Sequence, residues 1–218
     1  MTDWSDDTQN HRAILEMGVS IWNQWRASEP LTAPDLRGAD LSGLELENIN
    51  FARADLRGAN LTNAYLYDAD FQQGDLRGAI LTRAMLVGAN LCKANLSEAV
   101  LERAYLNQSD LSYANLTGAC LQEADLQAAL LMEATLVNAR LASAEMSESE
   151  GLTVLQIKAA KDSQLAFLRK DLMCLPASES GVRPAKRVNN VTRNRRRTLV
   201  RAPEVMAPRE PVFKSVAV

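Results

Sequence analysis

The sequence is poor in the residues and motifs on which most enzymes depend. It contains one histidine, His11, and it has no HExxH motif, no P-loop and no glycine-rich nucleotide motif. Its many carboxylates recur at fixed intervals beside arginine or polar neighbours, an arrangement that does not gather two of them in one pocket. The sequence therefore predicts a protein without enzymatic activity, cofactor or small-molecule substrate.

Cysteines are few, and long apolar runs are absent. The three cysteines, Cys92, Cys120 and Cys174, are odd in number and lack the spacing of metal ligands, so we expect free thiols and no metal site. No run of 18 apolar residues occurs, and the sequence does not start with a charged and then apolar leader. These features predict a cytoplasmic protein without a transmembrane segment.

The sequence is rich in one feature, a repeat of five residues. Between residues 36 and 146 a large apolar residue, nearly always Leu, falls on every fifth position for 23 consecutive repeats. The residue two positions before it is nearly always Ala. A period of five matches neither a helix, at about 3.6, nor a strand, at about 2. It predicts a solenoid in which each repeat packs on its neighbours.

The repeat resembles the consensus A-(D/N)-L-x-x of the pentapeptide-repeat family, as in Ala39–Gly43 and Ala59–Asn63. The likeness extends to cyanobacterial-type members and, more distantly, to quinolone-resistance proteins that engage DNA gyrase. It implies an all-β fold, a right-handed quadrilateral β-helix with four pentapeptides per coil and with Leu and Ala pointing inward. The 23 repeats then make nearly six coils. The string Asp-Leu-Arg-Gly-Ala supports a 20-residue coil, because it begins at Asp35, Asp55 and Asp75.

Before the repeats, residues 1–30 show a helical pattern. Their apolar side chains, including Ile14, Trp22 and Trp25, fall on one stripe of a single helix. An open solenoid end exposes apolar side chains and unpaired backbone groups. We therefore expect an N-terminal capping helix over the β-helix of residues 31–150.

After the repeats, the pattern becomes helical again. Thr153 and Gln156 match a capping box, which predicts a C-terminal helical cap over residues 151–175. One or two helices there would cover the far end of the β-helix, together with the outward residues Leu130 and Met132.

Charge is distributed unevenly along the chain. Residues 31–150 carry 17 acidic and 8 basic side chains, whereas residues 183–218 carry two acidic and ten basic ones. Residues 176–218 also hold five of the seven prolines, and together these features predict a disordered basic tail. Its clustered arginines are Arg193, Arg195, Arg196 and Arg197. The tail is compatible with three roles: binding nucleic acid or an anionic surface, docking on the acidic part of the β-helix, or solubilising the chain.

Assigning every fourth repeat to one face separates the outward side chains by charge. The first face begins with alternating acids and bases: Asp35, Arg37, Asp55, Arg57, Asp75 and Arg77. Because each base stands beside an acid, the pattern predicts a mutually neutralising ladder and argues against a phosphate-binding stripe.

The third face contains the repeats centred on Leu46, Leu66, Leu86, Leu106, Leu126 and Met146. Its outward residues include six acids and no Lys or Arg: Glu45, Glu47, Asp68, Asp125, Glu145 and Glu148. Among them stand the apolar and aromatic residues Tyr65, Tyr67, Met85, Val87 and Tyr105. Ile80 and Val100 lie on the neighbouring second face, which contains every fourth repeat from Leu41 to Leu141. Two interpretations remain open: a contact surface for a protein partner, or a ladder of side chains that only stabilises the stack.

The leading functional hypothesis is a non-enzymatic interaction or regulatory scaffold that presents this acidic, Tyr-rich face to a protein partner of unknown identity. A second hypothesis follows from the likeness to quinolone-resistance pentapeptide proteins, whose acidic rods resemble duplex DNA. It makes the chain a DNA-mimicking modulator of a DNA-binding enzyme such as gyrase. A third hypothesis is tethering to nucleic acid or to an anionic membrane through the basic tail.

Overall fold

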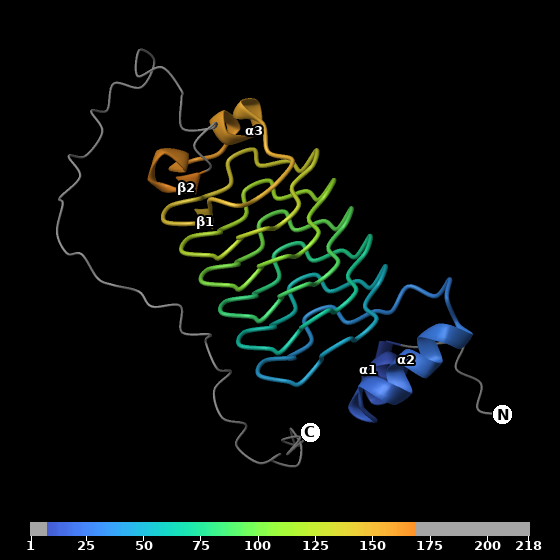
Figure 1. The fold of residues 1–218 in the computed structure, drawn as a ribbon. Helices are drawn as coiled ribbons and strands as arrows, with labels where there is room; N and C mark the ends of the chain where they lie inside the picture. The colour runs from blue at the N-terminus through green and yellow to red at the C-terminus, as the bar shows by residue number, and fades with distance from the viewer. Residues whose placement is uncertain (1–7, 169–218) are drawn as a thin grey trace, which may run out of the picture. The chain divides into compact units, whose positions relative to one another are not determined.

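The repeats form a stack of coils with two helices at one end and a short helix at the other (Figure 1). The computed structural model describes residues 8–168. Its elements, in chain order, are α1 (Thr8–Glu16), α2 (Val19–Ser28), β1 (Glu145–Met146), α3 (Val154–Ala159), η1 (Ser163–Leu165) and β2 (Phe167–Leu168). The stack occupies the chain between α2 and α3, and β1 lies in its last coil.

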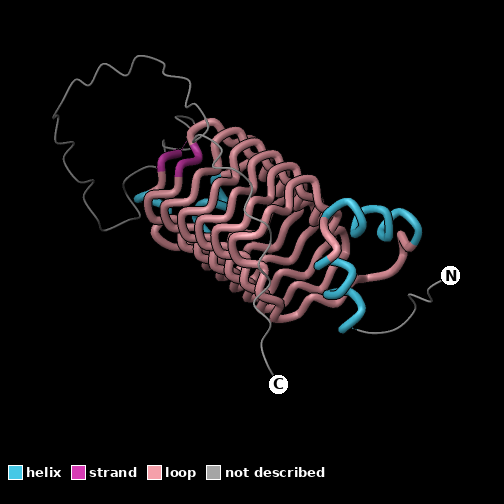
Figure 2. Tube along the Cα trace, turned by 90° about the horizontal axis from the view of Figure 1, so that it is seen from below, coloured by secondary structure: helices cyan, strands magenta, loops and turns pink. Residues whose placement is uncertain are grey.

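Parallel pairing at intervals of 20 residues holds the coils together. Every fifth residue from Asp35 to Leu130 forms a parallel bridge with the residue 20 positions further on. Backbone hydrogen bonds flank each bridge, for example Leu36 N to Asp55 O at 2.8 Å and Asp55 N to Pro34 O at 2.8 Å. The partners of each hydrogen bond lie in adjacent coils, so the hydrogen bonds run from coil to coil along the stack. One coil therefore contains 20 residues, and successive coils lie in regular layers (Figure 2).

A tight turn separates each extended segment from the next. The carbonyl of the core residue accepts a hydrogen bond from the amide three residues later, as between Leu36 O and Ala39 N at 3.1 Å. The third residue of the turn has a positive φ, which is the feature of a type II turn. Gly38 occupies this position with a φ of 59°, and Arg53 occupies the equivalent position with a φ of 61°. The stack thus imposes a left-handed backbone even on side chains that disfavour it.

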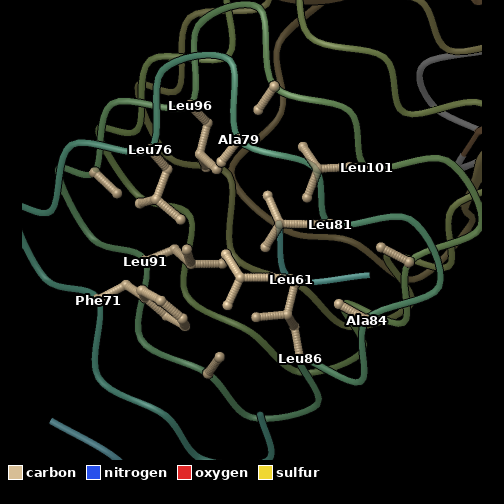
Figure 3. Packing of buried hydrophobic residues seen from close by; sticks show 14 of the residues in the cluster. Leu61, Phe71, Leu76, Ala79, Leu81, Ala84, Leu86, Leu91, Leu96 and Leu101 are labelled. Atoms are coloured by element: carbon tan, nitrogen blue, oxygen red, sulfur yellow. The ribbon is translucent and has the colours of Figure 1, made fainter. Parts of the chain in front are cut away.

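The interior of the stack alternates large and small side chains. The Leu or Phe of each repeat is buried, and so is the Ala that precedes it by two positions. In Figure 3, Leu76, Leu81, Leu86 and Leu91 point into one coil from its successive sides. Burial of each such Leu contributes on the order of 1.5–3 kcal/mol. Because a single repeat cannot enclose its own Leu, this stabilisation requires neighbouring repeats.

At the N-terminal end, helix α2 packs directly on the first coil. The Trp22 ring meets the Phe51 ring edge-on at 5.5 Å, and Trp22 Nε1 donates a hydrogen bond to Asn50 O at 2.7 Å. Arg26 donates to Ala52 O at 2.8 Å. The sequence predicts one continuous helix here, but the chain turns at Gly18, whose φ is 101°, and forms the two helices α1 and α2.

At the C-terminal end, the chain departs from the five-residue period but continues to pair with the stack. Helix α3 starts at a capping box between Thr153 and Gln156, and Gln156 Nε2 also donates to Ala134 O at 2.8 Å. Beyond α3, the parallel strand β2 pairs with β1, so that Phe167 lies beside Glu145. The sequence predicts a helical cap from residue 151 to 175. Its described part instead comprises one six-residue helix, a 3₁₀ turn and a strand. Residues 169–175 lie outside the described part.

None of the helices described between residues 8 and 168 is long and apolar enough to cross a membrane.

Candidate interaction face

The third face carries one column of outward side chains from coil to coil. Parallel bridges join its members in the order Glu45, Tyr65, Met85, Tyr105, Asp125 and Glu145. We call these six residues the central column. Tyr65 is 41% exposed and Tyr105 is 44% exposed, and Met85 lies half-buried between them. The column has an apolar and aromatic centre, with carboxylates at both ends.

The turns on one side of the central column add Tyr67, Val87 and Asp68. The Tyr67 hydroxyl donates a hydrogen bond to Met85 Sδ at 3.0 Å, so it fixes the Met85 side chain against the coil. Burial, aided by the nearby charge of Glu47, raises the pKa of Tyr67 above its usual range and keeps its hydroxyl protonated. Tyr67 and Val87 are both half-buried, so Tyr65 and Tyr105 provide most of the exposed aromatic surface.

The six carboxylates of the third face form no ion pair with any described residue. Asp125 Oδ1 accepts a hydrogen bond from its own turn at Gln127 N, at 3.0 Å. Glu145 Oε1 accepts one from Ser147 N, at 3.1 Å. Both contacts use a backbone amide, and no cation of residues 8–168 forms an ion pair with either carboxylate.

The first face differs, because its acids are already paired. Arg37 lies 2.5 Å from the carboxylate of Asp35 and 3.7 Å from that of Asp55 in the next coil. Arg57 bridges Asp55 and Asp75 in the same way, at 2.6 and 3.7 Å. Hydrogen bonds from Arg37 lower the pKa of Asp35 below its usual range. The predicted neutralising ladder is therefore confirmed for these three coils.

The opposite border of the third face carries two basic residues, Arg83 and Arg103. Residues 82–83 and 102–103 form the turns that precede Met85 and Tyr105, so Arg83 and Arg103 lie at the corner between the two faces. Arg103 Nε pairs with Glu123 at 2.9 Å. The corner could only be located once the turn hydrogen bonds were known.

Ile80 and Val100 lie beyond this corner. They are bridged to each other in adjacent coils of the second face, and Ile80 is 40% exposed. The turns that contain Arg83 and Arg103 separate them from Met85 and Tyr105. The structure thus places Ile80 and Val100 beside the central column without making them part of it.

A second exposed apolar cluster, which sequence reasoning missed, lies on the fourth face, which contains the repeats centred on Phe51, Phe71, Leu91, Leu111 and Leu131. It consists of Tyr113, Leu130 and Met132, and the Tyr113 hydroxyl approaches Met132 Sδ at 3.9 Å. The sequence suggested that the C-terminal helices cover Leu130 and Met132, but they are 41% and 53% exposed, because α3 packs on the end of the stack instead. Tyr113 occupies a turn position that otherwise carries glycine, alanine or a polar residue, and this exception was the available signal.

The whole repeat region matches one sequence family. The family model for pentapeptide repeats matches in eight copies, over residues 35–73, 45–83, 59–97, 84–122 and 119–150. Together these matches span residues 35–150, more than half of the chain. The chain belongs to the pentapeptide-repeat family. Family membership identifies the stack of coils as a right-handed β-helix solenoid.

Similar solved proteins include a fluoroquinolone resistance protein and two cyanobacterial pentapeptide-repeat proteins. QnrB1, a plasmid-mediated fluoroquinolone resistance protein, is 22% identical to this chain. The match covers 63% of this chain and 71% of the QnrB1 chain, with a TM-score of 0.55. Rfr23 from the cyanobacterium Cyanothece 51142 is 30% identical over 51% of this chain and 88% of its own, with a TM-score of 0.46. HetL from the cyanobacterium Nostoc sp. strain PCC 7120 is involved in heterocyst differentiation regulation. It is 30% identical over a match that covers 64% of this chain and 81% of HetL, with a TM-score of 0.18. No curated protein sequence matches the chain.

Within residues 8–168, this pentapeptide-repeat protein has no group of three or more His, Cys, Asp and Glu side chains that could hold a metal ion. Cys92 and Cys120 are free, half-buried thiols. His11 has a structural contact, since its Nδ1 accepts a hydrogen bond from Asp35 N at 3.2 Å and its ring lies 5.1 Å from Trp25. The tail arginines Arg193, Arg195, Arg196 and Arg197 lie outside the described residues, as does Cys174.

Proposed function

We propose that this pentapeptide-repeat protein is a non-enzymatic scaffold that presents its third face to a protein partner. The observation that carries the proposal is the exposure of Tyr65 and Tyr105 on either side of Met85, in a column fixed by backbone pairing. Exposed tyrosine and methionine are enriched where proteins bind one another, and tyrosine buries a large amphipathic area at a small entropic cost. Membership of the pentapeptide-repeat family supports an interaction role in general terms, without indicating the partner.

The alternative interpretation, a ladder of tyrosines that only stabilises the stack, has less support. Stacked rings would stabilise neighbouring coils if their faces or edges met at about 4.5–7 Å. Among the residues described, the ring contacts involve only His11, Trp22, Trp25, Phe51 and Phe71. Tyr65 and Tyr105 lie two coils apart with Met85 between them, so their rings remain available to a partner.

A comparison of two triple variants tests this function. The first changes Tyr65, Met85 and Tyr105 to Ser, and the matched control changes Tyr113, Leu130 and Met132 to Ser on the fourth face. Both variants keep the buried Leu and Ala residues, so we expect both to unfold cooperatively close to the midpoint of the unchanged protein.

Pull-downs from cell extract should then recover a protein with the unchanged chain and the control variant but not with the third-face variant. Cross-linking from position 105 should join that protein to the third face. Equal recovery with all three chains would contradict the proposal.

A second candidate function is DNA mimicry toward an enzyme such as gyrase. It is favoured by the negative charge of residues 31–150, which hold 17 acids and 8 bases. The paired Asp and Arg residues of the first face weaken it, because they remove the negative potential from one side of the stack. Gyrase recovered in the pull-down and displaced by duplex DNA would favour this candidate over the general scaffold.

A further inference from the structure

We infer that the third face binds an extended partner segment that is apolar in its middle and cationic at both ends. This inference rests on the proposed function, because it specifies the chemistry of the partner that the third face would bind. Three features of the central column lead to it: the nature of its centre, the state of its carboxylates and the distance between its ends.

The centre of the column requires apolar contact. Tyr65 and Tyr105 each leave more than two fifths of their surface exposed, and Met85 presents a flexible thioether between them. The hydrogen bond from Tyr67 to Met85 Sδ limits the movement of that side chain. A partner with aliphatic side chains can cover this strip and remove it from water.

The ends of the column require positive charge. Glu45 lies one coil before Tyr65 and Asp125 lies one coil after Tyr105, each directly in line with the tyrosines. Neither carboxylate forms an ion pair with a described residue, in contrast to Asp35 and Asp55, which arginines of the first face already neutralise. A cation on the partner would therefore meet a carboxylate without displacing any ion pair of the described residues. An arginine suits both neighbours, since its guanidinium also stacks on tyrosine rings.

The distance between the two ends sets the length of the segment. Adjacent coils lie about 4.8 Å apart, so the four steps from Glu45 to Asp125 span about 19 Å. An extended peptide rises about 3.3 Å per residue. Cations about six residues apart therefore match the two ends, with the residues between them facing Tyr65, Met85 and Tyr105. Duplex or single-stranded nucleic acid does not fit, because its phosphates would face the same carboxylates.

Fluorescence anisotropy with the full chain and labelled peptides tests the inference. The probe peptide has nine residues, two arginines at each end and alternating valine and threonine between them. One control peptide has glutamate in place of arginine, and another has the same composition with its four arginines together at one end. We expect the probe to bind at least tenfold more tightly than either control. We expect this binding to weaken at least tenfold when sodium chloride is raised from about 50 to 500 mM.

Three variants assign the binding to the face. The charge variant Glu45→Gln, Glu47→Gln and Asp125→Asn should bind the probe at least tenfold more weakly. The variant with Tyr65, Met85 and Tyr105 changed to Ser should show a similar loss. The matched control Asp110→Asn, Glu133→Gln and Glu150→Gln makes the same change in net charge on the fourth face and should bind like the unchanged protein. An equal loss in the control would show that only net charge matters and would overturn the inference.

The remaining outcomes separate this inference from the proposed function. If the probe does not bind while the third-face variant still loses a protein in the pull-down, the cationic segment is wrong and the scaffold function stands. If neither experiment distinguishes the third face, both are wrong. If changing Arg193, Arg195, Arg196 and Arg197 to Gln strengthens probe binding tenfold or more, the basic segment of this chain competes for the face, and a separate partner is not its first occupant.

Discussion

At the scale of the residue, the third position of each turn is under the most uniform constraint. Gly43 adopts a φ of 67° there and Ala128 a φ of 55°, and the same left-handed conformation recurs with Lys93 and Tyr113. Glycine adopts this conformation freely, whereas other L-residues pay roughly 1–2 kcal/mol. The repeat tolerates the strain because each of the four turns of a coil is held by its neighbours above and below.

Opposite substitutions at two turns should therefore have opposite effects. A methyl group added at Gly43 meets no atom within 4 Å, so Gly43→Ala tests the backbone alone and should lower the free energy of unfolding by about 1 kcal/mol. Ala128→Gly relieves the same backbone strain and should raise the free energy of unfolding by roughly 0.5 kcal/mol. The gain is small because glycine also makes the unfolded chain more flexible. Urea unfolding of both variants measures the two changes. A change of the same sign in both would show that φ is not the cause.

The residue scale is also where the candidate site was least predictable. The 20-residue period was sufficient to align Tyr65, Met85 and Tyr105, because alignment depends only on the count of residues. It did not place Arg83 and Arg103 at the border of the third face, since that depends on which residues form the turn. The sequence did predict the pairing of Asp35 with Arg37, because each base of the first face stands beside an acid. The third face offers Glu45 no such neighbour, and Glu45 forms no ion pair with a described residue.

At the scale of the element, the two ends were harder to predict than the repeats. The apolar stripe of Trp22 and Trp25 predicts a helix correctly, but a helical period continues across Gly18 and gives no sign of the bend. Glycine with a φ of 101° permits the turn, and packing of α2 on Phe51 selects it. After residue 150 the intervals between paired residues lengthen to 21 and 22, as in Arg140 with Lys161, so counting by five no longer applies.

Removing the contact of α2 with the stack should expose the N-terminal end. Trp22 is fully buried against Phe51, and Trp22→Ala should cost about 3–5 kcal/mol of this local packing. With α2 loosened, the exposed edge of the first coil can pair with another molecule, so we expect association that increases with protein concentration. Light scattering after size-exclusion chromatography measures the mass. Ile21→Ala, on the same helix but 41% exposed, should remain like the unchanged protein; equal masses for all three chains would contradict the capping role.

The packing of α1 should depend on pH through His11. Burial lowers the pKa of His11 below its usual value near 6.5, although Asp35 opposes this shift and Arg26 adds to it. Protonated His11 could no longer accept the hydrogen bond from Asp35 N. The folded state thus binds fewer protons than the unfolded state, so stability is complete above pH 6.5 and declines as the pH falls through the lowered pKa. Urea unfolding at pH 7.5 and 5.5 should show this decline. His11→Gln should reduce the difference, because carboxylates titrate mainly below about pH 5.

At the scale of the whole molecule, the fold was the most predictable property. A strict five-residue period over 23 repeats leaves few other architectures, because every inward Leu needs a partner 20 residues away. Function was less predictable for the same reason: the repeat fixes the buried positions and leaves the outward ones free. Tyr65 and Tyr105 stand where the consensus has Asp or Asn, so they are departures from the repeat, and they distinguish the third face.

Deleting residues 183–218 should separate the binding properties of the two parts of the sequence. This segment carries ten bases and two acids, and residues 31–150 carry an excess of nine acids. We expect the intact chain to bind duplex DNA at about 50 mM salt and to lose at least a hundredfold in affinity at about 200 mM, because released counterions drive such binding. The shortened chain should not bind DNA, yet it should keep the protein recovered through the third face. DNA binding that survives the deletion would locate it in residues 1–182, and a partner lost on deletion would make the basic segment part of the interaction surface.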